Sequence, residues 1–191
     1  MTTLLLASSS PARQALLQRL GLPFSALSPD IDETPHASED IVSMVGRLSL
    51  AKAQALAHRH QGLVIGSDQA LGLEGRILGK PGNHEAATRQ LSQLSGRRVT
   101  FQTGLCLLNT VSGQHQLIVE PFEVEFRSLN AAQIERYLRA DTPYGCAGSF
   151  KSEALGITLF KSWQGRDPNS LIGLPLMALV DMLANEGIEL P

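Results

Sequence analysis

A run of serines followed by a proline and an arginine is the first part of this chain that could do chemistry. Residues 8–10 are all serine, Pro11 opens a helical pattern over residues 11–20, and Arg13 lies in its first turn. Backbone N–H groups and the positive end of the helix dipole favour an anion at such a helix start. An arginine adds a planar fork of donors suited to phosphate. The segment therefore predicts a phosphate site, and the alternative is an ordinary helix cap made by serine.

Two lysines could each bind an anion instead of being ordinary surface side chains. Lys52 falls on the same face of a predicted helix over residues 38–60 as the apolar positions of that helix. It either extends along the surface toward water or points its ammonium at a buried anion. Lys80 lies in a Gly-Lys-Pro loop between a predicted hairpin and the next helix, where it is either a phosphate ligand or a surface lysine.

Acidic side chains follow two of the predicted strands. Asp68 comes directly after the apolar strand over residues 63–66, and ligands gather at the carboxyl ends of strands in open α/β sheets. A carboxylate there could hold a divalent metal or orient a water, and capping a turn is the alternative. Asp32 and Glu33 lie in an acidic and proline-rich loop over residues 29–37, either as metal ligands or as solvated loop acids.

Together these features suit a metal–triphosphate complex. Phosphates need lysine, arginine and N–H donors, whereas Mg²⁺ prefers hard oxygen ligands such as carboxylates. The metal offsets the charge that builds up during displacement at phosphorus. The sequence contains neither a Gly-x-x-x-x-Gly-Lys-Ser/Thr loop nor a Gly-x-Ser-x-Gly motif, and its five histidines fit no metal or catalytic-triad spacing.

Strands that alternate with helices must position these residues, and this alternation predicts an α/β fold. Turns at residues 74–75 and 112–113 predict antiparallel hairpins, so the sheet is expected to be mixed. Expected helix caps are Asn83 and the pair formed by Asn130 and Gln133. The predicted strands cover residues 3–7, 24–28, 63–67, 70–78 (a small hairpin), 98–108, 116–127 and a stretch near 157–160, and the predicted helices cover 11–20, 38–60, 84–95, 130–140 and 175–186.

Composition excludes several classes of protein. The 191 residues suffice for one domain or one two-lobed domain. Lysine and arginine number 16 against 18 acidic residues, a net charge of −2 that gives no basic footprint for nucleic acid. No apolar run reaches the ~18 residues of a membrane helix, and no signal-peptide pattern is present, so we expect a cytoplasmic protein. Cys106 and Cys146 fit no metal or redox spacing.

Several motifs, in this order, resemble those of the Maf family of nucleoside triphosphate pyrophosphatases. They are residues 7–13, 32–35, 52–53, 66–69, 79–81, 146–153 and 173–175, which span nearly the whole chain. The resemblance implies a single domain over residues 1–191. Its mixed, partly antiparallel sheet and flanking helices would form two lobes around a cleft, similar to the inosine triphosphate pyrophosphatases. It also implies hydrolysis between the α- and β-phosphates to a monophosphate and pyrophosphate, a divalent cation (Mg²⁺ or Mn²⁺) and a homodimer.

The resemblance also assigns roles to the polar residues described above. Asp68 would activate the attacking water, Glu33 would assist, and both carboxylates would hold the metal. Lys52 and Lys80 would hold phosphates and take part in catalysis. The remaining phosphate ligands would be Ser8, Ser9 and Arg13.

Base selection follows from three further positions. The branch of the family that acts on thymidine and uridine triphosphates carries Thr after the aspartate and Gln in the later motif. This chain has Gln69 and Glu153 there, which is similar to the branch acting on 7-methylguanosine triphosphate. A carboxylate can accept from the guanine N1–H and amino group, and it attracts the cationic methylated ring. Ala12 departs from the bulky aromatic of close relatives, which would give such a ring a face.

The expected function is therefore the removal of modified nucleotides, with 7-methyl-GTP as substrate. Three alternatives stay open. One is a regulator that binds a nucleotide without turnover, since proteins of this family have been linked to inhibition of septum formation. The others are a pyrophosphatase that prefers dTTP or UTP, and a nucleotidyltransferase that uses the same phosphate site.

Overall fold

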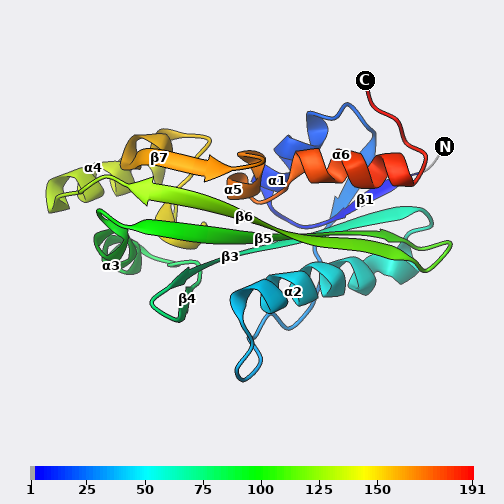
Figure 1. The fold of residues 1–191 in the computed structure, drawn as a ribbon, viewed down its shortest axis with the longest axis horizontal. Coiled ribbons are helices and arrows are strands. Elements are labelled where there is room, and N and C mark those ends of the chain that lie inside the picture. The colour runs from blue at the N-terminus through cyan, green and yellow to red at the C-terminus, as the bar shows by residue number, and fades with distance from the viewer. Residues whose placement is uncertain (1–2) are drawn as a thin grey trace. The chain divides into compact units, whose positions relative to one another are not determined.

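The computed structural model describes residues 3–191, which form a mixed α/β fold on one seven-stranded sheet (Figure 1). The strands are β1 (Leu4–Ala7), β2 (Phe24–Leu27), β3 (Leu63–Leu73), β4 (Arg76–Leu78), β5 (Arg98–Asn109), β6 (His115–Phe126) and β7 (Phe160–Gly165). The helices are α1 (Pro11–Gln18), α2 (Ile41–Leu56), α3 (His84–Leu94), α4 (Ala131–Asp141), α5 (Asn169–Ile172) and α6 (Leu176–Asn185). Short 3₁₀ turns occupy Ala57–Arg59 (η1), Ala147–Ser149 (η2) and Leu155–Leu159 (η3).

The sheet has the order β2-β1-β3-β5-β6-β7, and β4 pairs with β3 off this path. β1 runs parallel to both β2 and β3, whereas β4 is antiparallel to β3 and β7 is antiparallel to β6. The sequence-based expectation of a mixed, partly antiparallel sheet is therefore confirmed.

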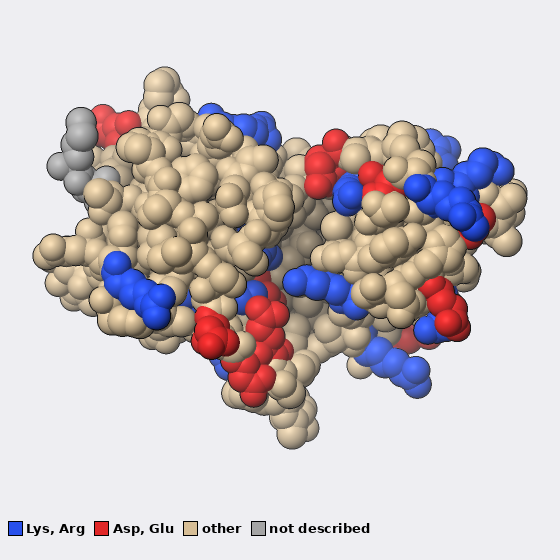
Figure 2. Space-filling view, turned by 180° about the vertical axis from the view of Figure 1, so that it is seen from behind, with Lys and Arg blue, Asp and Glu red and all other residues tan. Residues whose placement is uncertain are grey.

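The described residues divide into two compact units, and each is described by itself. The first comprises residues 3–69, 102–120 and 167–191, and the second comprises residues 70–101 and 121–166. Among the described residues, no helix is both long and apolar enough to span a bilayer. Lysine and arginine side chains lie scattered among acidic and uncharged ones on the face shown in Figure 2.

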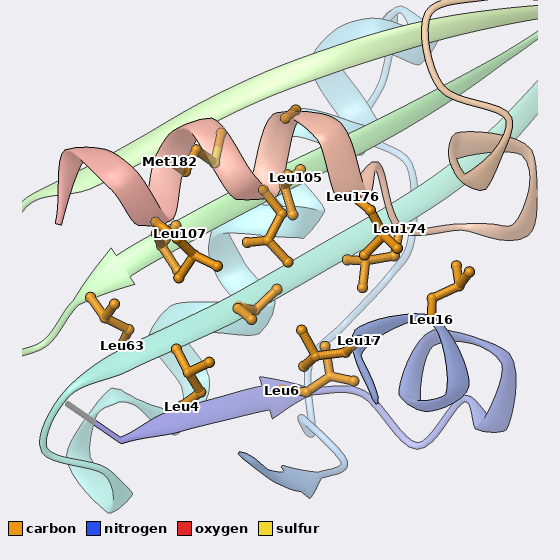
Figure 3. Close-up of a cluster of buried hydrophobic side chains, with 14 residues drawn as sticks. Leu4, Leu6, Leu16, Leu17, Leu63, Leu105, Leu107, Leu174, Leu176 and Met182 are labelled. Atoms are coloured by element: carbon orange, nitrogen blue, oxygen red, sulfur yellow. The ribbon is translucent and has the colours of Figure 1, made fainter. Parts of the chain in front are cut away.

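Alternating side chains of the strands in the first unit enter two separate apolar clusters, because successive residues of a strand point to opposite faces. Leu4 and Leu6 of β1 join a leucine-rich cluster with α1 and α6 (Figure 3). Leu5 and Ala7 instead pack with Ala53 and Leu56 of α2 on the other face. β1 is thus buried on both faces, as its uninterrupted apolar sequence predicts.

An aromatic cluster forms much of the core of the second unit. The Phe150 ring makes edge-to-face contacts with the rings of Phe101, Phe126 and Phe160, with centroids 4.9–5.8 Å apart. Edge-to-face pairs are favourable because the positive ring edge meets the negative ring face. Phe150 lies in the segment after η2 and fixes that segment against the sheet.

Most expected elements are present, and the helix caps are confirmed. Asn130 and Gln133 form a full capping box at α4, and the Asn83 side chain caps α3. Residues 74 and 75 turn the β3–β4 hairpin with positive φ angles, as expected.

Three boundaries differ from the expectation. β3 runs unbroken from Leu63 to Leu73, so Asp68 lies inside this strand, and the expectation that it follows the end of the strand is wrong. The helix predicted over residues 38–60 is shorter, because the Asp40 side chain caps α2 by accepting from the Ser43 N–H, and the helix tightens to η1 after Leu56. The strand predicted near residues 157–160 is wrong, since residues 155–159 form a 3₁₀ turn and β7 starts at Phe160. The Gly156 N–H donates to the Lys151 carbonyl, and a Cβ at Gly156 would lie 2.3 Å from that oxygen, so glycine permits this tight winding.

Candidate functional site

Two glycines bring α2 unusually close to the sheet in the first unit. A Cβ at Gly66 of β3 would lie 2.1 Å from the Ser49 carbonyl oxygen, and a Cβ at Gly104 of β5 would lie 2.4 Å from the Val45 carbonyl oxygen. Real Cβ atoms cannot approach so closely, so only glycine fits at both positions. The helix backbone therefore rests directly on the two strands, about one turn (Ser49) and two turns (Val45) before Lys52.

This close packing places the Lys52 ammonium between two carboxylates. Its Nζ lies 2.6 Å from Asp68 Oδ1 and 2.8 Å from Glu33 Oε1. The side chains of Lys52 and Asp68 are only 7% and 11% exposed, whereas that of Glu33 is 53% exposed. Lys52 therefore faces the interior and a buried anion, and the alternative of a lysine extended toward water is wrong. The anion consists of protein carboxylates.

The backbone of Asp68 is fixed by a buried serine. The Asp68 N–H donates to Ser49 Oγ at 2.9 Å, and the Ser49 hydroxyl donates to the Val45 carbonyl at 2.7 Å. Ser67 directly precedes Asp68, and its hydroxyl lies 2.8 Å from the carbonyl oxygens of both Gly104 and Gly173. The part of β3 that carries the carboxylate is thus held by side chains of its own unit.

An arginine anchors the loop that carries Glu33. Arg47 of α2 donates through Nε and Nη2 to the two carboxylate oxygens of Glu39, each at 2.6 Å. Its Nη2 also donates to the Thr34 carbonyl at 3.3 Å, directly after Glu33. Hydrogen bonding to Arg47 lowers the pKa of Glu39 to about 2. The acidic loop is therefore fastened to the helix that presents Lys52.

The serine-rich segment caps α1 and ties its arginine to a distant loop. Ser10 Oγ accepts from the Arg13 N–H at 3.4 Å, and Ser8 Oγ accepts from the Ser10 N–H at 3.1 Å. Ser8 is buried and Ser9 is exposed. Arg13 Nε donates to the Gly173 carbonyl at 2.8 Å, which uses one of the five guanidinium N–H groups.

Arg13 belongs to the same electrostatic group as the buried ion pair. Burial lowers the pKa of the Arg13 guanidinium, while the charges of Asp68 and Glu33 raise it. The Arg13 guanidinium and the Lys52 ammonium are thus within electrostatic reach of the same two carboxylates, and a bound polyphosphate would meet cationic groups already held in place. Ala12 is partly buried in the first turn of α1.

Gln69, the residue after the buried aspartate, donates its amide into the backbone of its own unit. Its Nε2 lies 2.7 Å from the Ser170 carbonyl and 3.0 Å from the Leu171 carbonyl. The Gln69 amide nitrogen thus already donates to two carbonyls, and a contact between Gln69 and a base edge stays a prediction.

Lys80 lies in the second unit, on an exposed segment that is held on both sides. Gln90 of α3 donates to the Gly79 carbonyl at 2.9 Å, and the Gly82 N–H donates to the Tyr144 carbonyl at 2.9 Å. The lysine side chain is exposed between these two anchors. The backbone is positioned, and the ammonium can reach an anion in solvent.

Glu153 is an exposed carboxylate of the same unit, two residues after a well-fixed lysine. The Lys151 N–H donates to the Tyr137 hydroxyl at 3.0 Å, and the Lys151 ammonium donates to the Asp141 carbonyl at 2.6 Å. Burial raises the pKa of the Cys146 thiol, and the nearby charge of Glu153 raises it further. Cys146 therefore stays protonated near neutral pH and is a poor candidate for a nucleophile.

The residues around Lys52 fit a cation that arrives with a polyphosphate. Within residues 3–191 there is no group of three or more His, Cys, Asp or Glu side chains that could hold a metal ion. Mg²⁺ is commonly bound by one or two carboxylates together with substrate phosphates and water. Asp68 and Glu33 supply two such carboxylates, each with a second oxygen besides the one that faces Lys52.

Sequence reasoning singled out the charged residues but missed those that position them. The sequence pattern does not indicate the positioning roles of Ser49, Ser67 and Arg47. Ser49 carried a usable signal, because it is a polar residue three positions before Lys52 and therefore on the same helix face. The close approach at the two glycines carried no local signal, since it depends on how α2 packs.

The chain is similar to known proteins over nearly its whole length. A family model described as Maf-like protein matches residues 3–186. A protein of Alcanivorax borkumensis named 7-methyl-GTP pyrophosphatase is 56% identical over 190 residues, covering 99% of this chain and 96% of its own length. A protein of the same name from Pseudomonas syringae pv. tomato is 57% identical over 192 residues and covers 100% of both chains.

Solved structures are more distant. A HAM1 protein from Coxiella burnetii is 21% identical, covers 66% of this chain and 73% of its own, and gives a TM-score of 0.48. A nucleoside-triphosphatase (dITP/XTP pyrophosphatase) from Mycobacterium abscessus is 18% identical, covers 67% of this chain and 76% of its own, and gives a TM-score of 0.44.

Proposed function

The chain belongs to the Maf family, and from this premise we propose that it is a nucleoside triphosphate pyrophosphatase that cleaves 7-methyl-GTP between the α- and β-phosphates. The products would be 7-methyl-GMP and pyrophosphate. Relatives with that name are 55–57% identical across essentially the whole chain, which supports this substrate. The observation that carries the proposal is the buried Lys52 ammonium between Asp68 and Glu33.

In the proposed reaction, Asp68 receives a proton from the attacking water. A new bond forms between the water oxygen and one phosphorus of the α–β bridge, and the bond from that phosphorus to the bridging oxygen breaks. Lys52 donates to Asp68 Oδ1 and keeps the carboxylate oriented for this role. The Lys52 and Arg13 charges also offset the negative charge on the phosphate oxygens.

A divalent cation fits this chemistry as a partner of the substrate. Asp68 and Glu33 would hold Mg²⁺ or Mn²⁺, and the cation would supply further neutralisation of phosphate charge. Ser8 and Ser9 would add hydrogen bonds to phosphate at the start of α1, and Lys80 would contribute a further charge.

Base choice is assigned to Glu153. Its carboxylate can accept from the N1–H and 2-amino group of guanine and attracts the cationic 7-methylated ring. Thymine and uracil present carbonyl oxygens beside their single N–H, and these oxygens repel a carboxylate. Ala12 supplies no aromatic face, so recognition would depend on Glu153 more than on stacking. We also propose that the protein acts in the cytoplasm as a homodimer, which the family resemblance supports.

The test is a panel of triphosphates assayed for pyrophosphate release, with and without Mg²⁺ or Mn²⁺. We expect 7-methyl-GTP to be the best substrate and release to stop when EDTA removes the cation. Glu153→Gln should lower the rate on 7-methyl-GTP relative to dTTP and UTP, because a site that loses a substrate-reading partner leaves polar groups unpaired. Glu85→Gln, an exposed carboxylate of the same unit, is the matched control.

Each alternative has its own outcome in this panel. Binding of 7-methyl-GTP without pyrophosphate release would indicate a regulator that binds nucleotide without turnover. Higher activity on dTTP or UTP would replace the substrate but keep the reaction. Consumption that requires an added acceptor would indicate a nucleotidyltransferase.

A further inference from the structure

We propose that Gln90 of α3 is a positioning residue for Lys80: it links the loop of this lysine to the buried Ser149 and thereby sets where the ammonium meets the triphosphate. The inference rests on the proposed function and deepens it, because it assigns the way in which one lysine of that site is held. The residues that carry it all belong to the second unit.

The Gln90 side chain makes a hydrogen bond with each end of its amide. Its Nε2 donates to the Gly79 carbonyl at 2.9 Å, and its Oε1 accepts from the Ser149 hydroxyl at 2.6 Å. A carbonyl oxygen only accepts, so the amide nitrogen must face Gly79, and the hydroxyl then donates to the amide oxygen. The residue directly before Lys80 is therefore connected to η2 through one amide.

Ser149 has a backbone conformation that its surroundings must hold. Its side chain is completely buried, and its φ of +62° lies in the left-handed region, which residues with a Cβ rarely adopt. A glycine would adopt this φ more easily, so the hydroxyl is what a serine adds at this position. Such conformations persist only where the surrounding structure fixes them, and they cluster at functional sites. The Ser149 hydroxyl thus gives the Gln90 amide a fixed donor.

The direction of the Lys80 side chain depends on the backbone that carries it, because the side chain itself is exposed. Gln90 holds the loop before Lys80, and after Lys80 the Gly82 N–H donates to the Tyr144 carbonyl at 2.9 Å. A cation that is already positioned loses less conformational entropy when it binds its anion. Without the Gln90 amide, the phosphate would have to order the loop of Lys80 as it binds.

The carboxylate assigned to base choice is held by other groups. The Lys151 N–H donates to the Tyr137 hydroxyl at 3.0 Å, and the Lys151 ammonium donates to the Asp141 carbonyl at 2.6 Å. These contacts hold the turn that carries Glu153 without the Gln90 amide. Loss of that amide should therefore weaken the binding of phosphate and leave base choice unchanged.

The test measures the binding of inorganic tripolyphosphate, which has no base, beside that of 7-methyl-GTP, both in EDTA so that the nucleotide is not cleaved. Gln90→Met keeps the length of the side chain and removes both hydrogen bonds. We expect both dissociation constants to rise by the same factor, roughly fivefold, as for the loss of one neutral hydrogen bond. Gln93→Met changes an exposed glutamine three residues later on α3. It is the matched control and should leave both constants unchanged.

A double variant separates positioning from a merely stabilising role. In a Lys80→Ala background, Gln90→Met should weaken tripolyphosphate binding by much less than in the wild type, because its effect passes through Lys80. Additive losses would overturn the proposal. So would a loss confined to 7-methyl-GTP, which would place the effect on the base, and so would unchanged binding of both ligands or a wild type that binds no tripolyphosphate.

If Gln90→Met does not fold, Ser149→Gly tests the same relationship. Glycine adopts the positive φ and lacks only the hydroxyl that orients the Gln90 amide. This variant should weaken the binding of both ligands by the same factor, and unchanged binding or a selective effect on 7-methyl-GTP would contradict the inference. Because these are binding measurements, a wild type that binds tripolyphosphate but releases no pyrophosphate would remove the proposed function, while the dissociation constants would still decide this inference.

Discussion

The Lys52 ammonium lies 2.6 Å from Asp68 Oδ1, with both side chains almost fully withdrawn from solvent. Burying such a pair costs desolvation that its mutual attraction often fails to recover, so it is weak support for stability. Buried charged pairs are instead typical of functional sites, where a carboxylate has to stay ionised and oriented. The pair explains why this lysine lies on the core-facing side of α2.

Asp68→Asn should lower the rate of pyrophosphate release by roughly 10²–10⁴-fold, because an amide cannot accept the proton of the attacking water. Folding should survive, since Glu33 still faces the Lys52 ammonium at 2.8 Å. The measurement is the turnover of 7-methyl-GTP beside a thermal unfolding curve. Asp30→Asn, an exposed carboxyl of the same unit, should behave like the wild type. Near-normal turnover by Asp68→Asn would rule out the proposed base.

Lys52→Met should reduce both stability and catalysis. It leaves the Asp68 and Glu33 carboxylates facing one another without a cation, and breaking a buried pair in this way costs about 3 kcal/mol. Lys161→Met removes an exposed ion pair with Glu125 and should cost at most about 1 kcal/mol. Urea unfolding at pH 7 measures the difference. Equal losses in the free energy of unfolding from the two variants would mean that the buried ion pair contributes no more to stability than the exposed one.

The sequence predicts which residues of the site carry chemistry better than it predicts which of them contact one another. Asp68 and Lys52 stood out because each interrupts an apolar pattern, and both prove to lie together. That the anion facing Lys52 is Asp68 itself could not be predicted, since it depends on the close approach of α2 at Gly66 and Gly104. That approach is a tertiary contact without a local signature.

The same limit applies to the residues that follow the buried aspartate. The motif around Gln69 predicts a base contact, which stays a prediction, but it does not indicate that the Gln69 amide nitrogen donates to carbonyls about a hundred positions away in the sequence. Among the elements, long periodic segments such as α3 and α4 were predicted well. The apolar run of residues 155–159 was mistaken for a strand, because a short apolar stretch fits either state and the turn depends on Gly156.

Gly66→Ala should destabilise the protein and reduce activity together. The added methyl would lie 2.1 Å from the Ser49 carbonyl oxygen, so α2 must move away from β3 and carry Lys52 with it. We expect a loss of about 3 kcal/mol in the free energy of unfolding, at the upper end of overpacking effects. Gly145→Ala, where a Cβ meets nothing within 4 Å, is the control. A Gly66→Ala protein of wild-type stability would refute the close approach.

Lys80→Ala should affect turnover and leave stability almost unchanged. The side chain is exposed, and surface substitutions usually change stability by less than about 0.5 kcal/mol. A lost charge-assisted bond to phosphate should lower kcat/KM for 7-methyl-GTP by roughly tenfold or more. Arg76→Ala removes another exposed cation of the same unit and should have little effect on kcat/KM. Similar kinetics for both variants would make Lys80 an ordinary surface lysine.

The Glu39–Arg47 pair should give the protein a measurable dependence on acid pH. Hydrogen bonding to Arg47 lowers the pKa of Glu39 from 4.5 to about 2, so the folded state holds its proton less tightly than the unfolded state. The stabilisation from this pair is therefore complete above pH 4.5 and is lost as the pH falls toward about 2. Glu39→Gln should lack it at pH 7 and show a flatter decline in stability over that range. Urea unfolding between pH 7 and pH 2 measures this decline, and Glu85→Gln should keep the wild-type profile. Parallel curves for Glu39→Gln and the wild type would show that the loop carrying Glu33 is not fastened through this ion pair.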